Sequence, residues 1–340
     1  MNAKEKVLVT GATGFIGSYL VRYLLSKGYE LRCLKREKSK LDLVADFYDQ
    51  VDWVETELTD VIGLQKAFEQ ITHVCHCAAL PSFHPKDKRN MFESNVQATA
   101  NVVNLCLENN IEKLIHVSSI AAIGRTPTRL KVDETCEWVE SKDNSTYGIT
   151  KHLAEMEVWR GIAEGLNAVI VSPSVVVGSK TWDDGMAGFF KKIDNGLKFC
   201  PSGQSGFVDV RDVVLFMEMM LKSEITGERY ILNSVNLKHQ DFFRLIAKSL
   251  DVKEPTIVVG PILSEVAWRV EWLKEKLLGM LPMVTKESAR ASVTHYYYSN
   301  KKSLTVPGFN YRSIEATIKE MAAQYKEAKA NGFSSRYLPL

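Results

Sequence analysis

The chain alternates between short apolar runs and longer stretches in which apolar residues recur every three or four positions. From residue 6, "KVLVTGATGFIGSYLVRYLLSKGYE" combines an apolar strand, a glycine-rich turn and an amphipathic helix. Further apolar runs predict strands, and helical periodicity predicts helices between them. Buried strands that alternate with helices are typical of a parallel sheet covered on both faces. The predicted strands cover 31–36, 51–58, 72–79, 113–121 and 167–178, and the predicted helices cover 60–70, 95–110 and 146–165.

This regular alternation ends after Gly178. Residues 179–206 are rich in Gly, Ser and aromatic residues and contain one predicted helix. A strand–helix–strand pattern returns over about 207–235, and the last hundred residues are mostly helical in pattern. We therefore expect an α/β fold, a doubly wound parallel sheet over residues 1–175 with a smaller, mostly helical C-terminal lobe over 176–340. Segments near 207–235 are expected to return to the first domain.

One late segment, 261–284, has an apolar stripe at helical spacing. The stripe comprises residues 262, 263, 266, 270, 273, 277, 280, 281 and 284. The charges at Glu265, Arg269 and Glu271, with three more over 274–276, exclude a membrane-spanning helix, which needs about 20 mainly apolar residues. The segment is predicted to be a core or lid helix, with peripheral contact of 262–284 with a membrane surface or a partner as the alternative.

Composition narrows the class of protein without naming it. Of the 340 residues, 45% are hydrophobic and 25% charged, as in ordinary globular proteins, and the net charge of +2 gives no overall basic field for nucleic acid. Six cysteines are too few for a disulfide framework, and the first strand begins too early for a signal peptide, so a reduced, cytoplasmic setting is expected. Because alternate strand residues face opposite ways, "HVCHCAA" predicts no metal site.

The glycine-rich turn carries the first chemical signal. In "TGATGFIG", Gly11, Gly14 and Gly17 follow a strand and open a helix. Glycines let the backbone approach a pyrophosphate, and the free N–H groups of the helix start bind its charge. The strand–turn–helix context is what this motif requires, so the sequence predicts a Rossmann-type dinucleotide site over 1–175.

The end of the second strand bears on the choice of dinucleotide. An acidic residue there binds the ribose 2′-OH of NAD, whereas a basic residue accommodates the 2′-phosphate of NADP. Arg36 stands where this selector belongs, with Glu37 as a mild signal for NAD. NADP is therefore the predicted cofactor, with NAD as the alternative.

A Tyr and a Lys four positions apart form a candidate acid–base pair, but five such pairs occur among the twelve tyrosines. The place of each pair relative to the predicted strands distinguishes the catalytic candidate from the others. Tyr147 and Lys151 open the helix after the strand that ends in Ser118 and Ser119, so all four should reach the carboxyl edge of the sheet. The other pairs are Tyr23–Lys27, Tyr297–Lys301, Tyr298–Lys302 and Tyr325–Lys329.

Taken together, the ordered motifs resemble the extended branch of the short-chain dehydrogenase/reductase superfamily. They span nearly the whole chain, and "YYSNKKSLTVPGFNYRSIEATIKE" resembles the usual ending of this branch. Within it, the basic end of "ELRCLKR" is most like the dihydroflavonol 4-reductase and 3β-hydroxysteroid dehydrogenase group. The motifs are "TGATGFIG", "CAA" (77–79), "NVQAT" (95–99), "VSS" (117–119), "YGITK" (147–151), "SPSVVVG" (172–178) and "FVDVRDV" (207–213).

The resemblance implies a Ser–Tyr–Lys active site for hydride transfer at a carbonyl or secondary alcohol. Tyr147 would exchange the proton, Lys151 would lower the Tyr147 pKa and hold the ribose, and Ser119, or else Ser118, would orient the substrate oxygen. Asn95 would support a bound water, or else cap its helix. Residues expected to bind the cofactor are Gly11, Thr13, Gly14, Phe15, Ile16, Gly17, Arg36, Glu57, Leu58, Cys77, Ala78, Ala79, Tyr147, Lys151 and Pro173.

The variable loop offers a hydrophobic substrate site. Trp182 and Phe189 are candidate contacts there, with aromatic packing of the small lobe as the alternative. The rival functions are an NAD-dependent sugar-nucleotide epimerase or dehydratase and a non-catalytic dinucleotide sensor. The expected partners are a small-molecule substrate, no nucleic acid and no membrane span, in a monomer or a homodimer.

Overall fold

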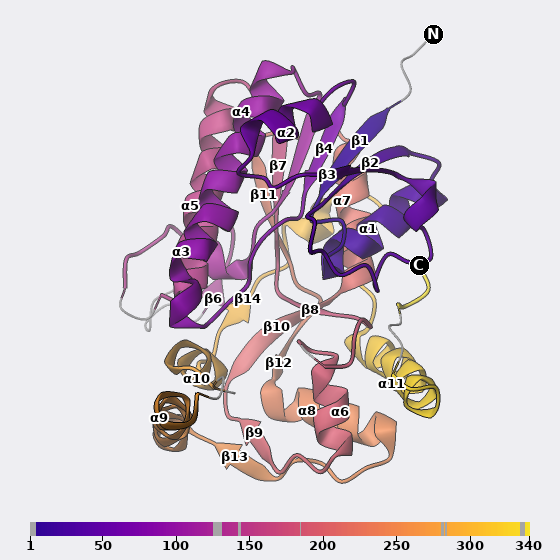
Figure 1. Ribbon diagram of the computed structural model, residues 1–340. Coiled ribbons are helices and arrows are strands. Elements are labelled where there is room, and N and C mark those ends of the chain that lie inside the picture. Colours follow the sequence, from indigo (N-terminus) through magenta and orange to yellow (C-terminus); the bar gives the residue numbers. More distant parts are fainter. Residues whose placement is uncertain are drawn as a thin grey trace.

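A seven-stranded parallel sheet forms the centre of the molecule (Figure 1). The structure is a computed structural model, and it describes residues 5–124, 131–141, 144–183, 185–279, 282, 284–333 and 337–340. The strands run in the order β11-β7-β5-β4-β1-β2-β3, and each neighbouring pair is parallel. This confirms the predicted doubly wound sheet. The strands are β1 (Lys6–Thr10), β2 (Glu30–Lys35), β3 (Asp52–Glu55), β4 (His73–His76), β5 (Lys113–Val117), β7 (Ala168–Pro173) and β11 (Glu228–Leu232).

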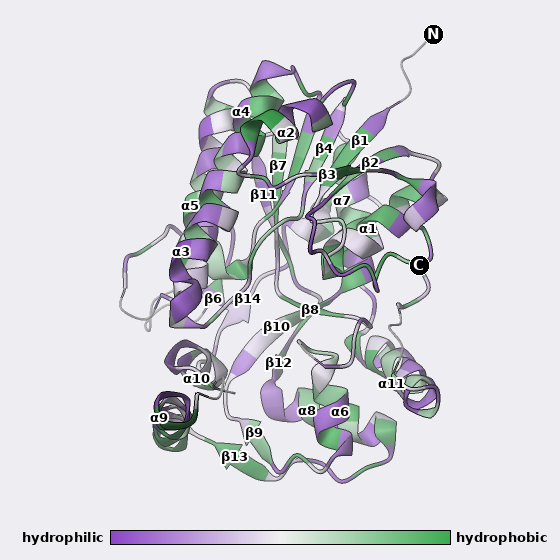
Figure 2. Ribbon diagram, in the orientation of Figure 1, coloured by the Kyte–Doolittle hydropathy of each residue, from purple (hydrophilic) through white to green (hydrophobic). Residues whose placement is uncertain are grey.

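Both faces of this sheet are covered by helices. Because side chains of a strand alternate, Val7 and Val9 of β1 pack into one hydrophobic cluster and Leu8 into another. The first cluster includes residues of α1 (Phe15–Ser26) and α7 (Val210–Leu221); the second includes residues of α2 (Val61–Ala67), α4 (Ala98–Glu108) and α5 (Thr146–Ala163). Figure 2 shows hydrophobic strands at the centre and hydrophilic residues on the outward helix faces.

The predicted strand over 167–178 is divided between two sheets. Its first part is β7, which ends at Pro173, and its second part is β8 (Val175–Val177), which pairs with β10 (Gln204–Asp209) in a three-stranded sheet with β12 (Val235–Lys238). Proline has no N–H to extend a ladder, which explains a strand end there. The split sends the chain from the large sheet into the second lobe.

Short elements build the rest of the second lobe (Figure 1). Helix α6 packs against α8, and α9 packs against α10. Two further pairs of short strands are parallel. The elements are α6 (Gly188–Asp194), β9 (Phe199–Pro201), α8 (His239–Leu250), β13 (Ile257–Val259), α9 (Pro261–Leu278), α10 (Lys286–Val293), β14 (Tyr297–Tyr298) and α11 (Ile314–Ala330). Two short elements come from the first half of the chain: β6 (Lys131–Val132) pairs with β14, and α3 (Lys88–Met91) contacts α5.

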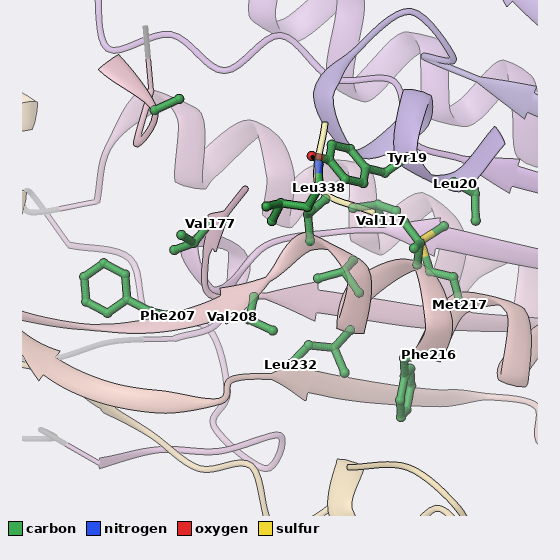
Figure 3. Close-up of a cluster of buried hydrophobic side chains, with 14 of the residues drawn as sticks. Tyr19, Leu20, Val117, Val177, Phe207, Val208, Phe216, Met217, Leu232 and Leu338 are labelled. Atoms are coloured by element: carbon green, nitrogen blue, oxygen red, sulfur yellow. Dashed lines mark hydrogen bonds between the residues drawn. The ribbon is translucent and has the colours of Figure 1, made fainter. Parts of the chain in front are cut away.

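The C-terminus returns to the first helix of the sheet domain. Leu338 is buried, and its backbone N–H donates to Tyr19 Oη at 2.7 Å (Figure 3). The same hydroxyl donates to Ser179 O at 2.8 Å. One side chain of α1 therefore joins the start of the variable loop to the end of the chain.

Candidate active site

The three glycines of the β1–α1 turn have different structural roles. Gly11 adopts φ +67°, and a Cβ there would lie 2.7 Å from the Ala78 backbone. A Cβ on Gly17 would lie 2.1 Å from Gly11 O, so this glycine allows the helix to pack on the turn. A Cβ on Gly14 would have a single close neighbour, Gly11 O at 3.1 Å. Gly14 therefore faces the open space where a ligand could approach the backbone.

This open space lies at the start of α1, and the N-terminus of a helix is a favourable place for an anion. Gly14 is the N-cap of α1, and no side chain among the described residues makes a capping hydrogen bond there. Phe15 and Ile16 form the first turn, directly after Thr13. Free N–H groups and the positive helix end suit a pyrophosphate. The turn fits a dinucleotide in the manner that the glycine pattern predicts.

The turn also lies at the topological switch point of the sheet. The chain runs outward from β1 through β2 on one side and through β4 on the other. Dinucleotides bind at such a point, beyond the carboxyl ends of the strands. Cys77 and Ala78 follow β4 here, and their N–H groups donate to Thr10 O at 3.2 Å and Thr10 Oγ1 at 3.3 Å. Ala79 continues this segment, so "CAA" borders the predicted site.

The second and third strands contribute an exposed rim. Arg36 directly follows β2 and is exposed; its backbone N–H donates to Ser39 Oγ at 2.9 Å. Lys35 is engaged by Glu55 of β3, whereas the Arg36 side chain has no ion pair among the described residues. Glu57 and Leu58 lie in the turn after β3, where Leu58 O accepts from Asn101 Nδ2 at 2.9 Å. Arg36 is therefore free to bind a ligand phosphate.

Tyr147 stands in the first turn of α5, facing Ser119. The N-cap Ser145 accepts from Gly148 N at 3.0 Å and fixes the start of the helix. A Cβ on Gly148 would lie 2.8 Å from Ala121 O, so this glycine lets α5 approach the 3-10 turn Ile120–Ala122 that Ser119 caps. Burial raises the pKa of Tyr147, and its hydrogen bond with the Ser119 side chain acts in the lowering sense.

Lys151 lies one turn further along α5 and is 1% exposed. Its Nζ donates to Val117 O, at the end of β5, at 2.8 Å. Burial lowers the Lys151 pKa to about 8, while Glu155 and Cys77 act in the raising sense. The Tyr147 pKa is raised and not lowered as expected: desolvation of the phenol is its largest cause, and the Lys151 ammonium is not among its causes.

The two neighbouring serines have different partners. Ser118 Oγ donates to Glu155 Oε2 at 2.6 Å, and both residues are buried. Glu155 also accepts from Arg229 at 2.8 Å, in a buried ion pair between α5 and β11. Ser119 Oγ accepts from Ala121 N at 3.1 Å and meets Tyr147. Ser118 thus has a structural partner, and the geometry favours Ser119 as the serine that faces a substrate.

Asn95 belongs to the framework of the site. It lies within a π-helical turn, Phe92–Gln97, and not at a helix start, so it is not the plain cap that was one expectation. Its amide binds Leu80 N at 2.7 Å, Leu80 O at 3.2 Å and Thr150 Oγ1 at 3.0 Å. The side chain therefore joins the segment after β4 to α5.

The aromatic candidates of the variable loop pack within the second lobe. Trp182 is 1% exposed, with its ring 5.2 Å from that of Tyr325 in α11. Phe189 lies 4.7 Å from the ring of Phe243 in α8. These positions favour packing over substrate contact. Pro173 lies at the carboxyl end of β7, on the edge of the sheet that carries the other candidates.

Two residues near Tyr147 were not predicted from the sequence. The ring of Phe83 meets the Tyr147 ring edge-on at 6.3 Å and is 42% exposed. Glu287 of α10 accepts from the backbone and the hydroxyl of Thr146, at 2.9 to 3.2 Å. Neither residue belongs to a recognisable motif, and 141 positions separate Glu287 from Thr146. Within the described residues, no cluster of His, Cys, Asp and Glu could hold a metal ion.

Comparison with known proteins agrees with this arrangement. Residues 7–233 match the model of the NAD dependent epimerase/dehydratase family. A Synechocystis sp. protein with the provisional name dihydroflavonol 4-reductase is 30% identical over 91% of both chains. The cinnamoyl-CoA reductase CAD2 of Medicago truncatula is 26% identical over 96% of this chain and 98% of its own.

Solved structures show the same fold. The crystal structure of gox2253 has a TM-score of 0.81 and 30% identity, and covers 95% of this chain and 98% of its own. The Bordetella bronchiseptica enzyme WbmG, in complex with NAD and UDP, has a TM-score of 0.75 and 21% identity over 94% of each chain. The chain therefore belongs to the NAD-dependent epimerase/dehydratase family and is an NAD(P)-dependent enzyme of the extended short-chain dehydrogenase/reductase type.

Proposed function

We propose that this enzyme reduces a carbonyl group of a hydrophobic small molecule, with Tyr147 as the proton donor and NADPH as the preferred cofactor. The observation that carries the proposal is the close packing of α5, which carries Tyr147 and the buried Lys151, against the turn that Ser119 caps. When bound, the dinucleotide supplies the hydride for the carbonyl carbon. The carbonyl oxygen then needs one proton, which the phenol can donate.

The electrostatics of the site suit the reductive direction. Burial raises the pKa of Tyr147, so the phenol holds its proton at neutral pH, as a proton donor must. Ser119 can donate a hydrogen bond to the substrate oxygen and favour the developing negative charge. Lys151 lies in the same helix, where its ammonium can hold the ribose hydroxyls and stabilise the phenolate that remains.

A largely apolar substrate is supported by the half-exposed Phe83 ring against Tyr147. The names of the two similar reductases point to aromatic carbonyl compounds as the first substrates to test. The proposal includes a dinucleotide-binding domain over 1–175 and a substrate lobe over 176–340, with such a substrate bound between Tyr147 and the second lobe. The oligomeric state, monomer or homodimer, is part of the same proposal.

The test is a screen of aromatic and alicyclic ketones and aldehydes for NADPH oxidation, with the Tyr147→Phe variant as its control. The variant keeps the ring, so it should bind NADPH normally and lose on the order of 10²–10⁴-fold in turnover. Equal turnover of both proteins would contradict the role of Tyr147. If no ketone reacts and a UDP-sugar is converted with bound NAD, the sugar-nucleotide epimerase function is correct instead.

A further inference from the structure

Helix α9 exposes its apolar side to solvent. Among its residues, all of which the structure describes, Ser264 alone is buried. Ile262 is 85% exposed, Leu277 71% and Val266 52%. At about 100° of rotation per residue, six apolar positions fall within an arc of about 100° on one side of the helix. This apolar stripe comprises Ile262, Leu263, Val266, Val270, Leu273 and Leu277, each at least 43% exposed.

The charges of α9 are distributed unevenly around this stripe. Lys274 flanks it on one side, and Arg269 and Lys276 flank it on the other, by the same helical spacing. The side chains of Arg269 and Lys274 are 57% and 50% exposed. In contrast, Glu271 and Glu275 lie on the opposite side, where their side chains are 16% and 19% exposed. Arg269 is ion-paired with Glu265, and Lys274 with Glu271 at 2.8 Å, whereas Lys276 has no ion pair among the described residues. The border of the stripe therefore carries three basic groups, two of which are paired with acids of the same helix.

The third acid of the helix, Glu265, is already bound. It accepts from Arg269 at 2.5 Å and from the indole N–H of Trp268 at 3.1 Å. Trp272 extends the exposed side, and the Lys276 ammonium lies 5.2 Å from its ring. Trp268, Arg269, Trp272 and Leu273 border an open surface hollow of ≈ 490 Å³. Tryptophans beside basic residues are typical of helices at a lipid–water interface.

The same helix is joined to the rim of the candidate active site. Glu275 accepts hydrogen bonds from His84 at 3.2 Å and from Lys86 at 2.6 Å. His84 directly follows Phe83, whose ring contacts the ring of Tyr147. Ser264 Oγ donates to Ala289 O of α10, and α10 also carries the Glu287 that binds the start of α5. Figure 1 shows α9 at the outer edge of the second lobe, beside α10. The protein-facing side of α9, opposite the stripe, is therefore joined to the segment and the helix that border Tyr147.

We infer that α9 docks the protein on an anionic lipid surface, with the apolar stripe in the interface and Arg269, Lys274 and Lys276 at the headgroups. No helix among the described residues is long and apolar enough to cross a membrane, so the contact is peripheral. Charge favours an anionic lipid over a second copy of the chain, because the acids of a second α9 are already paired with Arg269, Lys274, His84 and Lys86, whereas headgroup phosphates can pair with Lys276. The inference does not depend on the proposed reduction.

The experiment measures binding of the full chain to phosphatidylcholine vesicles with and without phosphatidylglycerol. The wild type should sediment with the anionic vesicles and much less with the neutral ones. Val266→Glu combined with Leu277→Glu changes two exposed side chains, so the protein should fold and bind NADPH normally, yet lose on the order of tenfold or more in vesicle affinity. Ile62→Glu in α2, where Ile62 is 76% exposed, is the matched control and should change nothing.

A second pair tests the charges. Lys274→Glu combined with Lys276→Glu should weaken binding to anionic vesicles and leave the weak binding to neutral ones unchanged. Tyr147→Phe should bind vesicles as the wild type does, which separates this inference from the proposed activity. No binding by the wild type, or equal binding of the Val266→Glu/Leu277→Glu variant, overturns the inference. A concentration-dependent dimer that this variant abolishes, without vesicle binding, would identify the stripe as a self-association surface and overturn it as well.

Discussion

Ser118 and Ser119 are adjacent and have the same side chain, but their contacts give them different roles. Ser118 is buried against Glu155, whereas Ser119 is half-buried and caps the 3-10 turn that packs against the start of α5. The same sorting applies to the Tyr–Lys pairs. Tyr325 and Lys329 both bind Asp194 of α6, at 2.8 and 2.6 Å, and so join α11 to the second lobe. Spacing alone could not distinguish these roles, because it does not reveal the partner.

The two serines give the first residue-scale prediction. Ser119→Ala removes the hydroxyl that faces Tyr147, so turnover should fall on the order of 10²-fold with little loss of stability. Ser118→Ala leaves the buried Glu155 with one hydrogen bond fewer, so unfolding free energy should fall by about 1.5–3 kcal/mol. Turnover and urea unfolding of both variants provide the measurement. If Ser118→Ala is the variant that loses turnover, then Ser118 orients the substrate and Ser119 has the structural role.

Arg36 gives the second residue-scale prediction, which concerns the choice of cofactor. Its exposed guanidinium can bind a 2′-phosphate, and loss of such a charge-assisted contact costs about 1.5–3 kcal/mol. Arg36→Ala should therefore bind NADPH roughly tenfold to a hundredfold more weakly. NADH lacks the phosphate and is the internal control in the same fluorescence titration. A wild type that prefers NADH would show that NAD is the cofactor.

Lys151 links function to stability. Burial lowers its pKa from 10.5 to about 8, a cost of about 3 kcal/mol to the folded state below that pKa. Lys151→Met removes this cost but leaves Val117 O unpaired, so we expect a net gain of about 1–2 kcal/mol at neutral pH. The gain should shrink between pH 8 and 10.5, because the folded wild type then loses the proton that its unfolded chain still holds.

Urea unfolding of the cofactor-free proteins, below and above the Lys151 pKa, measures this difference. Turnover should be lost in the same variant, and NADPH binding should weaken, because the ammonium is proposed to hold the ribose. A variant that is less stable at neutral pH would show that the buried ammonium is better compensated than its depressed pKa indicates.

At the scale of elements, the predictable features are those with strong local signals. The strands of the large sheet and helices α1 and α5 were predicted because apolar runs and glycine turns mark them. The split between β7 and β8 was not, because "SPSVVVG" is apolar throughout and the pairing partners lie far along the chain. Segment 261–284 was predicted to be a core or lid helix, but α9 ends at Leu278 and its apolar stripe is exposed, so the interpretation as a core helix was wrong. Helical spacing of apolar residues does not reveal whether another element covers them.

The start of α1 gives the element-scale prediction. A side chain on Gly14 would occupy the space in front of the free N–H groups and touch only one backbone atom. Gly14→Val should therefore weaken NADPH and NADH alike and leave the fold largely intact. Gly17→Val, which would collide with Gly11, should unfold the protein. Unchanged cofactor titration of a folded Gly14→Val protein would show that the dinucleotide does not approach this turn.

At the scale of the whole molecule, segments far apart in the chain close the structure. β11 returns to the large sheet, as the strand–helix–strand pattern near 207–235 indicated, and the partition at residue 175 remains a prediction. Asp209 of β10 is buried and accepts a hydrogen bond from Thr317 of α11 at 2.7 Å, across 108 positions. Such contacts carry no local sequence signal, because each depends on the fold that it completes.

The Tyr19 hydroxyl gives the last prediction, since it holds three distant segments together. It donates to Ser179 O and accepts from Leu338 N within a buried environment (Figure 3). Tyr19→Phe keeps the ring packing but leaves a buried carbonyl and a buried N–H unpaired, so unfolding free energy should fall by about 2–3 kcal/mol. Tyr23→Phe, one turn further along α1, removes a hydroxyl with no such partners and should stay within about 0.5 kcal/mol of the wild type. Because the change lies in one hydroxyl, the urea midpoint should move without a change in the m-value. Equal midpoints for the two variants would mean that the C-terminal segment does not stabilise the sheet domain through this contact.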